Sequence, residues 1–332
     1  MISQIHRVLG LTVDYAAFRS LNFWHWRHHV NASTQEDVLR YGDQWLAVPA
    51  SEYYSLPENS TIPLSSVKID PGKAQRINFQ SPHPCDYEEN NRVGLDIFLC
   101  RPWSEAPVMI FMHGFMSASD TGYHIWCKLM NKRGINAIFL HLPYHYSRRP
   151  KNFVSGELAI SADLTRLAEG IRQSVKELRL LISDLKTLGT PKIGLFGMSY
   201  GGWIGALTTR VDTNVNLLTM VEPIVDISHV MWESLAARTM RRQLQKKGVG
   251  EESLSRLFSL VCPFEGQANC PGENILMLAG SYDQIAPPHH VKRLAQYWGA
   301  HYREYAQAHC GYKLQYRGWE DMQELLLPRF IL

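Results

Sequence analysis

Long apolar runs are missing from this chain. No stretch approaches the roughly 20 consecutive apolar residues of a membrane-spanning helix. The first ten residues include His6 and Arg7 but lack the apolar core of a secretion signal. The sequence therefore predicts no integral membrane segment and a cytoplasmic location.

A strong charge of one sign is also missing. The chain has 34 Lys and Arg residues against 31 Asp and Glu residues, which leaves a formal net charge of +3. Nucleic-acid binding normally requires a concentrated basic face, and so small an excess does not indicate one. We expect no nucleic-acid partner.

Cysteine pairs with metal-binding spacing do not occur. The six cysteines include no C-x-x-C pair and no other zinc spacing. A chain of 332 residues can bury a large core without disulfides, so we expect reduced thiols. Cys262 and Cys270 flank a short loop and could pair if the protein were exported. The sequence predicts neither a metal nor a cofactor.

Short apolar runs recur along the chain, as in the buried strands of a parallel sheet. Between the second and third of these runs, apolar residues from Leu164 to Leu185 follow the spacing of one helical face, which ends at Gly189. Amphipathic strands are expected at residues 92–100 and 301–306. The buried runs are Val108–Met112, Asn136–Leu140, Ile193–Phe196, Leu217–Val221 and Ile275–Ala279.

Strands that alternate with helices predict an α/β fold with a mostly parallel, doubly wound sheet and helices on both faces. Ligands then bind at the carboxyl ends of the strands. Residues 1–66 show no sheet pattern and are predicted to be an extension packed on a core of residues 67–332. Residues 226–260 are predicted to be a small helical insertion that caps the site.

The stretch Gly197-Met198-Ser199-Tyr200-Gly201 follows an apolar run and precedes a helical segment. A serine in this G-x-S-x-G context is typical of a nucleophile elbow, whose sharp turn leaves no room for side chains at the glycines. Ser199 is therefore the candidate nucleophile. The alternative is a glycine-rich turn that binds phosphate or only packs.

A serine nucleophile needs a base and a carboxylate that orients the base. Asp283 follows the run that ends at Ala279, and His309 follows the last short strand. The order Ser199, Asp283, His309 is the order of the elbow fold. Glu222, at the end of Leu217–Val221, is the rival acid.

The developing oxyanion needs hydrogen-bond donors. Val108–Met112 leads into His113 and a flexible Gly114, so the backbone amides of Phe115 and Tyr200 are the expected donors. His113 and Met116 in the same loop are candidates for substrate contact.

In these features the chain resembles the α/β-hydrolase superfamily over roughly residues 92–325. The resemblance implies the superfamily's fold, a catalytic triad and an oxyanion hole at the matching positions. The residues that carry it are His113-Gly114, the Gly197–Gly201 elbow, Gly280–Asp283 with Pro287, and His309.

A narrower similarity is to an uncharacterised bacterial branch, related to a eukaryotic abhydrolase group, which implies no particular substrate. It is carried by His141-Leu142-Pro143-Tyr144-His145 and Ser155-Gly156-Glu157. His141 and His145 are candidates for binding substrate or, alternatively, a metal or structural partners. Arg148 and Arg149 could hold an anionic substrate group or could be solvated.

The sequence thus predicts a serine hydrolase that cleaves a carboxylic ester through an acyl-enzyme on Ser199. An acyltransferase, a lyase and a non-catalytic ligand-binding homologue remain alternatives. The expected partner is a small-molecule or lipid ester. Phe23, Trp24, Trp26 and Val30 could touch lipid or pack on the core. The oligomeric state cannot be derived from the sequence.

Overall fold

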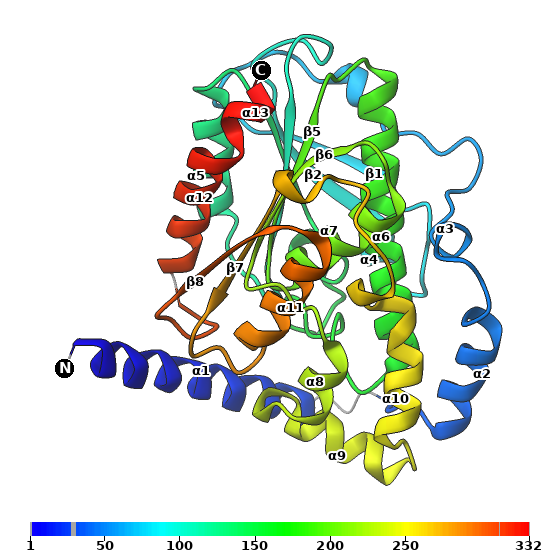
Figure 1. Ribbon diagram of the computed structural model, residues 1–332. Coiled ribbons are helices and arrows are strands. Elements are labelled where there is room, and N and C mark those ends of the chain that lie inside the picture. Colours follow the sequence, from blue (N-terminus) through cyan, green and yellow to red (C-terminus); the bar gives the residue numbers. More distant parts are fainter. Residues whose placement is uncertain (1, 28–30, 312, 332) are drawn as a thin grey trace.

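One mixed sheet of eight strands lies at the centre of the computed structural model, which describes residues 2–27, 31–311 and 313–331 (Figure 1). The order across the sheet is β1-β2-β4-β3-β5-β6-β7-β8. β2 pairs antiparallel with β1 and β4, and the other pairs are parallel. The strands are β1 Gln75–Gln80, β2 Arg92–Phe98, β3 Val108–Met112, β4 Asn136–Leu140, β5 Ile193–Met198, β6 Val215–Val221, β7 Ile275–Gly280 and β8 His301–Tyr305.

The predicted α/β fold with a mostly parallel sheet is confirmed. β3 and β4 have the predicted bounds, and β5, β6 and β7 extend the predicted runs by one or two residues. β1 escaped prediction because this edge strand is mostly polar. Only Phe79 of its six residues is buried.

Helices cover both faces of the sheet, and successive strand residues point to opposite faces. Ile110 belongs to the core under α6, α7 and α11, whereas Phe111 belongs to the core under α5, α12 and α13. The helices are α1 Ile2–Arg27, α2 Gln35–Trp45, α3 Ala50–Tyr53, α4 Glu88–Asn91, α5 Thr121–Asn131, α6 Leu164–Thr187, α7 Tyr200–Val211, α8 Ile227–Trp232, α9 Arg238–Lys246, α10 Glu251–Phe258, α11 Pro288–Trp298, α12 Lys313–Leu325 and α13 Leu327–Ile331.

The predicted long helix is α6. The Asp163 side chain caps its first turn by accepting the N–H of Arg166 at 3.0 Å. The apolar stripe from Leu164 to Leu185 is fully buried against the sheet. Gly189, with a φ of 81°, follows the helix in the left-handed conformation that glycine tolerates.

Two groups of helices stand apart from the helices that alternate with the strands. α1 to α3 precede β1, and α8 to α10 lie between β6 and β7. α1 runs along the end of the sheet beside α9 and the 3-10 turn Leu235–Ala237 (Figure 1). Asn22 of α1 ties these groups together, because its side chain donates to the carbonyl of Leu235 at 2.9 Å and accepts the N–H of Thr239 at 2.6 Å.

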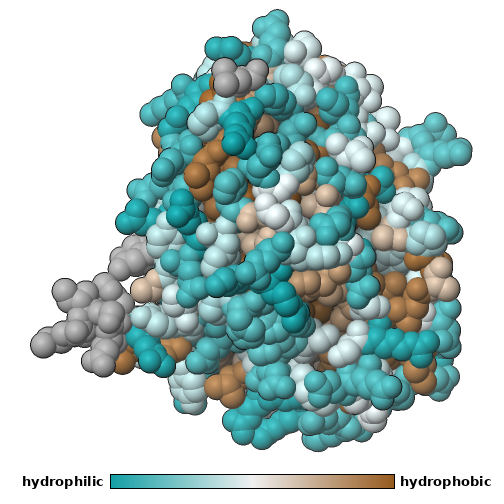
Figure 2. Space-filling view, in the orientation of Figure 1, coloured by the Kyte–Doolittle hydropathy of each residue, from teal (hydrophilic) through white to brown (hydrophobic). Residues whose placement is uncertain are grey.

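Hydrophilic side chains predominate on the face in Figure 2, where hydrophobic ones form separate groups. No helix in the described ranges is both long enough and apolar enough for a membrane crossing. Phe23 and Trp26 are 46% and 63% exposed, and their contact with lipid stays a prediction. Val30 lies outside the described residues.

All six cysteines are described, and all are free thiols. Cys262 and Cys270 therefore do not pair. Cys270 is buried.

Candidate active site

Ser199 sits on the turn between β5 and α7 with φ 47° and ψ −107°, a strained conformation for a residue with a side chain. Glycine is needed on both sides of it. A Cβ at Gly197 would lie 2.4 Å from the carbonyl oxygen of Gly201, and a Cβ at Gly201 would lie 2.6 Å from that of Met112. This close packing is the geometry of a nucleophile elbow.

The structure brings Ser199, His309 and Asp283 together. Ser199 Oγ lies 2.9 Å from His309 Nε2, and His309 Nδ1 lies 2.7 Å from Asp283 Oδ2. The other Asp283 oxygen accepts the N–H groups of Ile285 and Ala286, each at 2.8 Å. The carboxylate is thereby fixed, so that it can orient the imidazole.

Glu222 does not bind His309 Nδ1, the contact that an orienting acid would make. Its Oε1 accepts the side-chain N–H of Gln307 at 3.0 Å, whereas Nδ1 of His309 is bound by Asp283. Glu222 is 2% exposed, and burial raises the pKa of its carboxyl well above the usual value. Its φ of 50° is also strained.

The charges around His309 favour the protonated imidazole. Burial alone would lower the pKa of His309, but the nearby carboxylates, Asp283 first and then Glu222 and Asp14, raise it to about 9. The same charges would stabilise an imidazolium formed by proton transfer from Ser199 to His309.

The loop after β3 lies against Ser199, since a Cβ at Gly114 would be 3.7 Å from the Cβ of Ser199. The Gly114 N–H donates to the Tyr123 hydroxyl at 3.3 Å, and the Met116 N–H donates to His145 Nε2 at 3.1 Å. Within the described part of the chain, no hydrogen bond engages the N–H of Phe115 or of Tyr200. These two amides stay available to an oxyanion.

Two buried histidines brace this loop. His113 Nδ1 donates to the carbonyl of Gly114 at 2.9 Å, and His113 Nε2 accepts the Leu142 N–H at 3.0 Å. His145 Nδ1 donates to the carbonyl of Pro143 at 2.8 Å, while Nε2 accepts from Met116. Burial lowers the pKa of His145 to about 4 and that of His113 well below its usual value, so both rings are neutral.

The Ser155-Gly156-Glu157 segment packs against the same loop and against His145. The Ser155 hydroxyl donates to the carbonyl of Ser117 at 2.8 Å. Gly156 has a φ of 84°, and a Cβ there would lie 2.3 Å from His145 Nε2. The two short motifs that carry the narrower resemblance therefore meet in space, behind the loop that holds Phe115.

We expect His145→Leu to lower the free energy of unfolding by about 2 to 4 kcal/mol, because it leaves the Met116 N–H and the Pro143 carbonyl unpaired in the interior. Urea unfolding measures this change. His289→Ala, at an exposed histidine, is the matched control and should change the free energy by less than about 0.5 kcal/mol. Equal stability of the His145→Leu variant and the wild type would contradict the claim that His145 stabilises the loop after β3.

The structure corrects the expectation for Arg148. Its guanidinium is fully buried and binds the Glu177 carboxylate at 2.6 and 2.7 Å, so it is not available to a substrate anion. It also donates to the carbonyl oxygens of Asn90 and His141. Arg149 is exposed and, like Arg148, does not line the cavity at Ser199.

His113, His141 and His145 do not line that cavity either, which corrects their assignment to substrate contact; Met116 does line it. Both ring nitrogens of His145 have backbone partners, so this ring cannot also ligate a metal. His141 is 1% exposed, and its Nε2 lies 3.2 Å from Asp96 Oδ2. Structural hydrogen bonding accounts for these three histidines.

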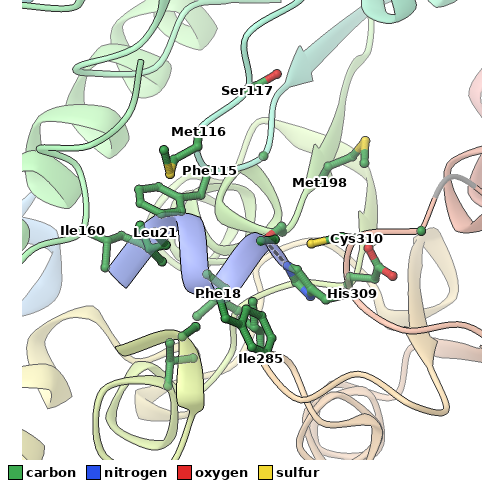
Figure 3. A pocket seen from close by; sticks show the side chains of 18 of the residues that line it. Phe18, Leu21, Phe115, Met116, Ser117, Ile160, Met198, Ile285, His309 and Cys310 are labelled. Atoms are coloured by element: carbon green, nitrogen blue, oxygen red, sulfur yellow. Dashed lines mark hydrogen bonds between the residues drawn. The ribbon is translucent and has the colours of Figure 1, made fainter. Parts of the chain in front are cut away.

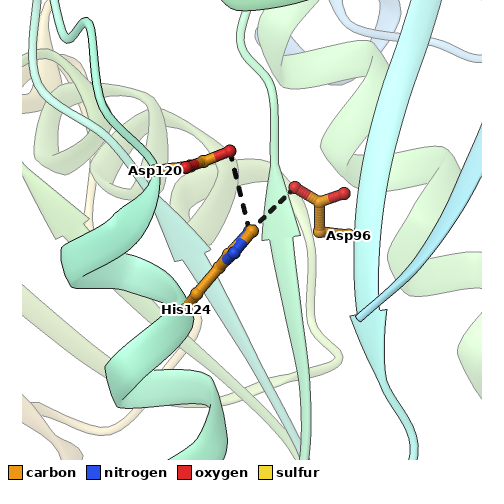
Figure 4. A group of neighbouring side chains, drawn as sticks. All are labelled: Asp96, Asp120 and His124. Carbon is orange, nitrogen blue, oxygen red and sulfur yellow. Dashed lines mark hydrogen bonds and ion pairs between the residues drawn. The ribbon is translucent and has the colours of Figure 1, made fainter. Parts of the chain in front are cut away.

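Asp96 also lies close to Asp120 and His124 in a cluster of potential metal ligands (Figure 4). His124 Nε2 is 3.0 Å from Asp96 and 3.9 Å from Asp120. The guanidinium of Arg76 binds both oxygens of Asp96. This positive charge disfavours a cation, and the cluster is an ion-pair network beside β2.

A cavity of about 300 Å³ opens at Ser199 and His309 (Figure 3). Its walls come from α1, the loop after β3, and the segment from α8 to α9. Most of its lining is apolar. The apolar side chains labelled in Figure 3 include Phe18, Leu21, Phe115, Met116, Ile160 and Ile285.

Sequence analysis missed the contribution of α1 to this cavity. Asp14, Phe18 and Leu21 are spaced by four and three residues, which is the spacing of one helical face. This helical spacing is visible in the sequence, but no local pattern connects it to the site. Asp14 and His309 are 295 positions apart.

Comparison with known sequences finds relatives of this chain. A model of the family described as alpha/beta hydrolase domain containing 18 matches residues 101–298, more than half of the chain. An uncharacterised protein of Mycobacterium tuberculosis, from strains CDC 1551 and H37Rv, is 25% identical over 278 residues. The match covers 78% of this chain and 65% of the relative, so the chain spans about two thirds of that relative's length.

Solved structures share the fold. An esterase from the Planctomycetes species Thermogutta terrifontis has a TM-score of 0.53 at 15% identity, over 78% of this chain and 93% of its own. A puromycin-hydrolyzing peptidase of Mycobacterium tuberculosis has a TM-score of 0.54 at 15% identity, over 78% of this chain and 41% of its own. Both compare with this chain in architecture only.

Proposed function

We propose that this chain, which belongs to the α/β-hydrolase family described as alpha/beta hydrolase domain containing 18, is a serine hydrolase that cleaves carboxylic esters. One observation carries the proposal. Ser199 lies on a strained elbow with its Oγ 2.9 Å from His309, whose other nitrogen is held by Asp283 at 2.7 Å. This is the arrangement that activates a serine for attack on a carbonyl.

In the proposed reaction, Ser199 Oγ attacks the ester carbonyl while His309 Nε2 accepts its proton. The oxyanion receives hydrogen bonds from the N–H groups of Phe115 and Tyr200. His309 then returns the proton to the leaving alcohol, which leaves an acyl group on Ser199. Water activated by His309 releases the acid and restores the enzyme. No cofactor takes part.

The apolar cavity supports an ester with a hydrocarbon acyl or alcohol group. One of its sides is lined by Val230 of α8, by Met240 of α9, and by Ala236 and Ala237 of the turn between these helices. This supports a cap role for residues 226–260. We also propose that residues 1–66 are an extension packed on the hydrolase core of residues 67–332. The proposed substrate of the enzyme is a small-molecule or lipid ester.

A fluorophosphonate probe and an activated ester test the function together. The probe is expected to label the wild type at Ser199. With the activated ester, the wild type is expected to release one molecule of acid for each molecule of ester consumed. Acid release separates hydrolysis from acyl transfer to an alcohol or amine, which would use the same residues. Ligand binding without labelling would instead indicate a non-catalytic homologue, and product formation without an acyl-enzyme would indicate a lyase.

The pH dependence follows from His309. The base must be neutral to accept a proton, and its pKa is raised to about 9. We therefore expect kcat/KM for an activated ester to rise about tenfold per pH unit through neutrality and to level off near pH 9. A stopped-flow pH profile measures it. A profile that is flat between neutrality and pH 9 would contradict His309 as the base.

A further inference from the structure

One stripe of helix α1 lies against the loop that carries His309. A Cβ at Gly10 would be 3.0 Å from the Cβ of Ala308, the residue before the histidine. Four positions on, Asp14 is 1% exposed. Its two carboxylate oxygens accept the backbone N–H groups of His309 at 3.0 Å and Cys310 at 2.8 Å.

The same stripe continues into the cavity. Phe18 and Leu21 follow Asp14 at helical spacing and are 4% and 9% exposed. Both side chains line the cavity at Ser199, and α1 passes directly across it in Figure 3. One helix therefore contacts both the backbone of the catalytic-base loop and the space for the substrate.

We infer that α1 is a working part of the active site, in which Asp14 is a positioning residue for His309, and Phe18 and Leu21 determine which acyl or alcohol group fits. This inference rests on the proposed ester hydrolysis. It assigns α1 a role in catalysis and selectivity that packing on the core alone would not give it.

The positioning role has a physical basis in the loop itself. His309 lies between the end of β8 and the start of α12, where no ladder of strand hydrogen bonds holds the backbone. A buried carboxylate that accepts two adjacent N–H groups fixes that backbone through charge-assisted hydrogen bonds. Its charge also adds to that of Asp283 in favouring the imidazolium.

Asp14→Asn and Asp14→Leu test the positioning role in the full chain with p-nitrophenyl acetate. We expect kcat to fall about tenfold to a hundredfold in Asp14→Leu, with KM nearly unchanged, because the base is displaced while the cavity is intact. The fall in kcat should be smaller in Asp14→Asn, since the amide oxygen of asparagine still accepts one of the two N–H groups. Val13→Ala, at a residue 52% exposed on the outer side of α1, is the matched control.

Phe18→Ala and Leu21→Ala test selectivity with p-nitrophenyl esters from acetyl to dodecanoyl. The ratio of kcat/KM for the longer over the shorter esters is expected to rise about tenfold, because the truncated side chains free space in the cavity. The Val13→Ala variant should keep the wild-type ratio. Thermal unfolding of each variant shows that it is folded.

The outcomes separate the two proposals. If the wild type is labelled and hydrolyses esters, but folded Asp14 and Phe18 variants match it in kcat and chain-length ratio, the inference about α1 is overturned and the function stands. If Asp14→Leu does not fold, the Asp14→Asn and Phe18→Ala results decide. A wild type that is neither labelled nor active rejects both proposals.

Discussion

Ser199→Ala is expected to abolish fluorophosphonate labelling and to lower kcat for an activated ester by about six orders of magnitude. The loss is this large because the nucleophile, base and acid act as one unit, and the base has no proton to accept once the hydroxyl is gone. The substitution removes a single oxygen and leaves the elbow backbone in place, so the fold should persist.

Ser281→Ala is the matched control for this variant. Ser281 also follows the carboxyl end of a strand, but its hydroxyl binds Glu304 at 2.7 Å and takes no part in the cavity. Its turnover should equal that of the wild type. Labelling or wild-type turnover of Ser199→Ala would reject Ser199 as the nucleophile.

Asp283→Asn has the second largest expected effect, a loss of about four orders of magnitude in kcat. The amide would bind the wrong tautomer of His309 and could not stabilise the imidazolium. Steady-state kinetics at pH 9 and above measure the loss, since a pKa of about 9 leaves about half of the wild-type base neutral at pH 9 and more of it at higher pH.

Glu222→Gln separates the two acids. Burial raises the pKa of the Glu222 carboxyl well above its usual value, and glutamine has nearly the same shape, so its amide oxygen can still accept the hydrogen bond from Gln307. We expect a loss of roughly tenfold or less, equivalent to about 1.4 kcal/mol. A greater loss than in Asp283→Asn would transfer the orienting role to Glu222.

Local sequence patterns predicted the central strands and the elbow because their causes are local. Fully buried strands need continuous apolar residues, and the runs at β3 and β4 have the predicted bounds. The glycines around Ser199 are needed by a turn only a few residues long. β1 had no such signal, since an edge strand with one buried residue needs no apolar pattern.

In the loop between Leu140 and Leu158, the local pattern did not predict which side chains face the interior. Its histidines and arginines follow a strand that ends at the site, which made them candidates for substrate contact. In the structure, Arg148 and His145 point into the interior and hold Glu177 and the Met116 amide. Whether a charged or polar side chain faces substrate or core depends on which partner the fold places next to it.

By itself, the sequence determined the fold class, the elbow and the residue types available for catalysis, because backbone preferences and apolar periodicity act over a few residues. The tertiary structure decided that Asp283 rather than Glu222 holds His309, that Arg148 and His145 point into the interior, and that α1 reaches the site. The contacts of His309 with Asp283 and with Asp14 join residues 26 and 295 positions apart. Hydrogen bonds of this kind depend on how distant segments pack together, so no local pattern encodes them.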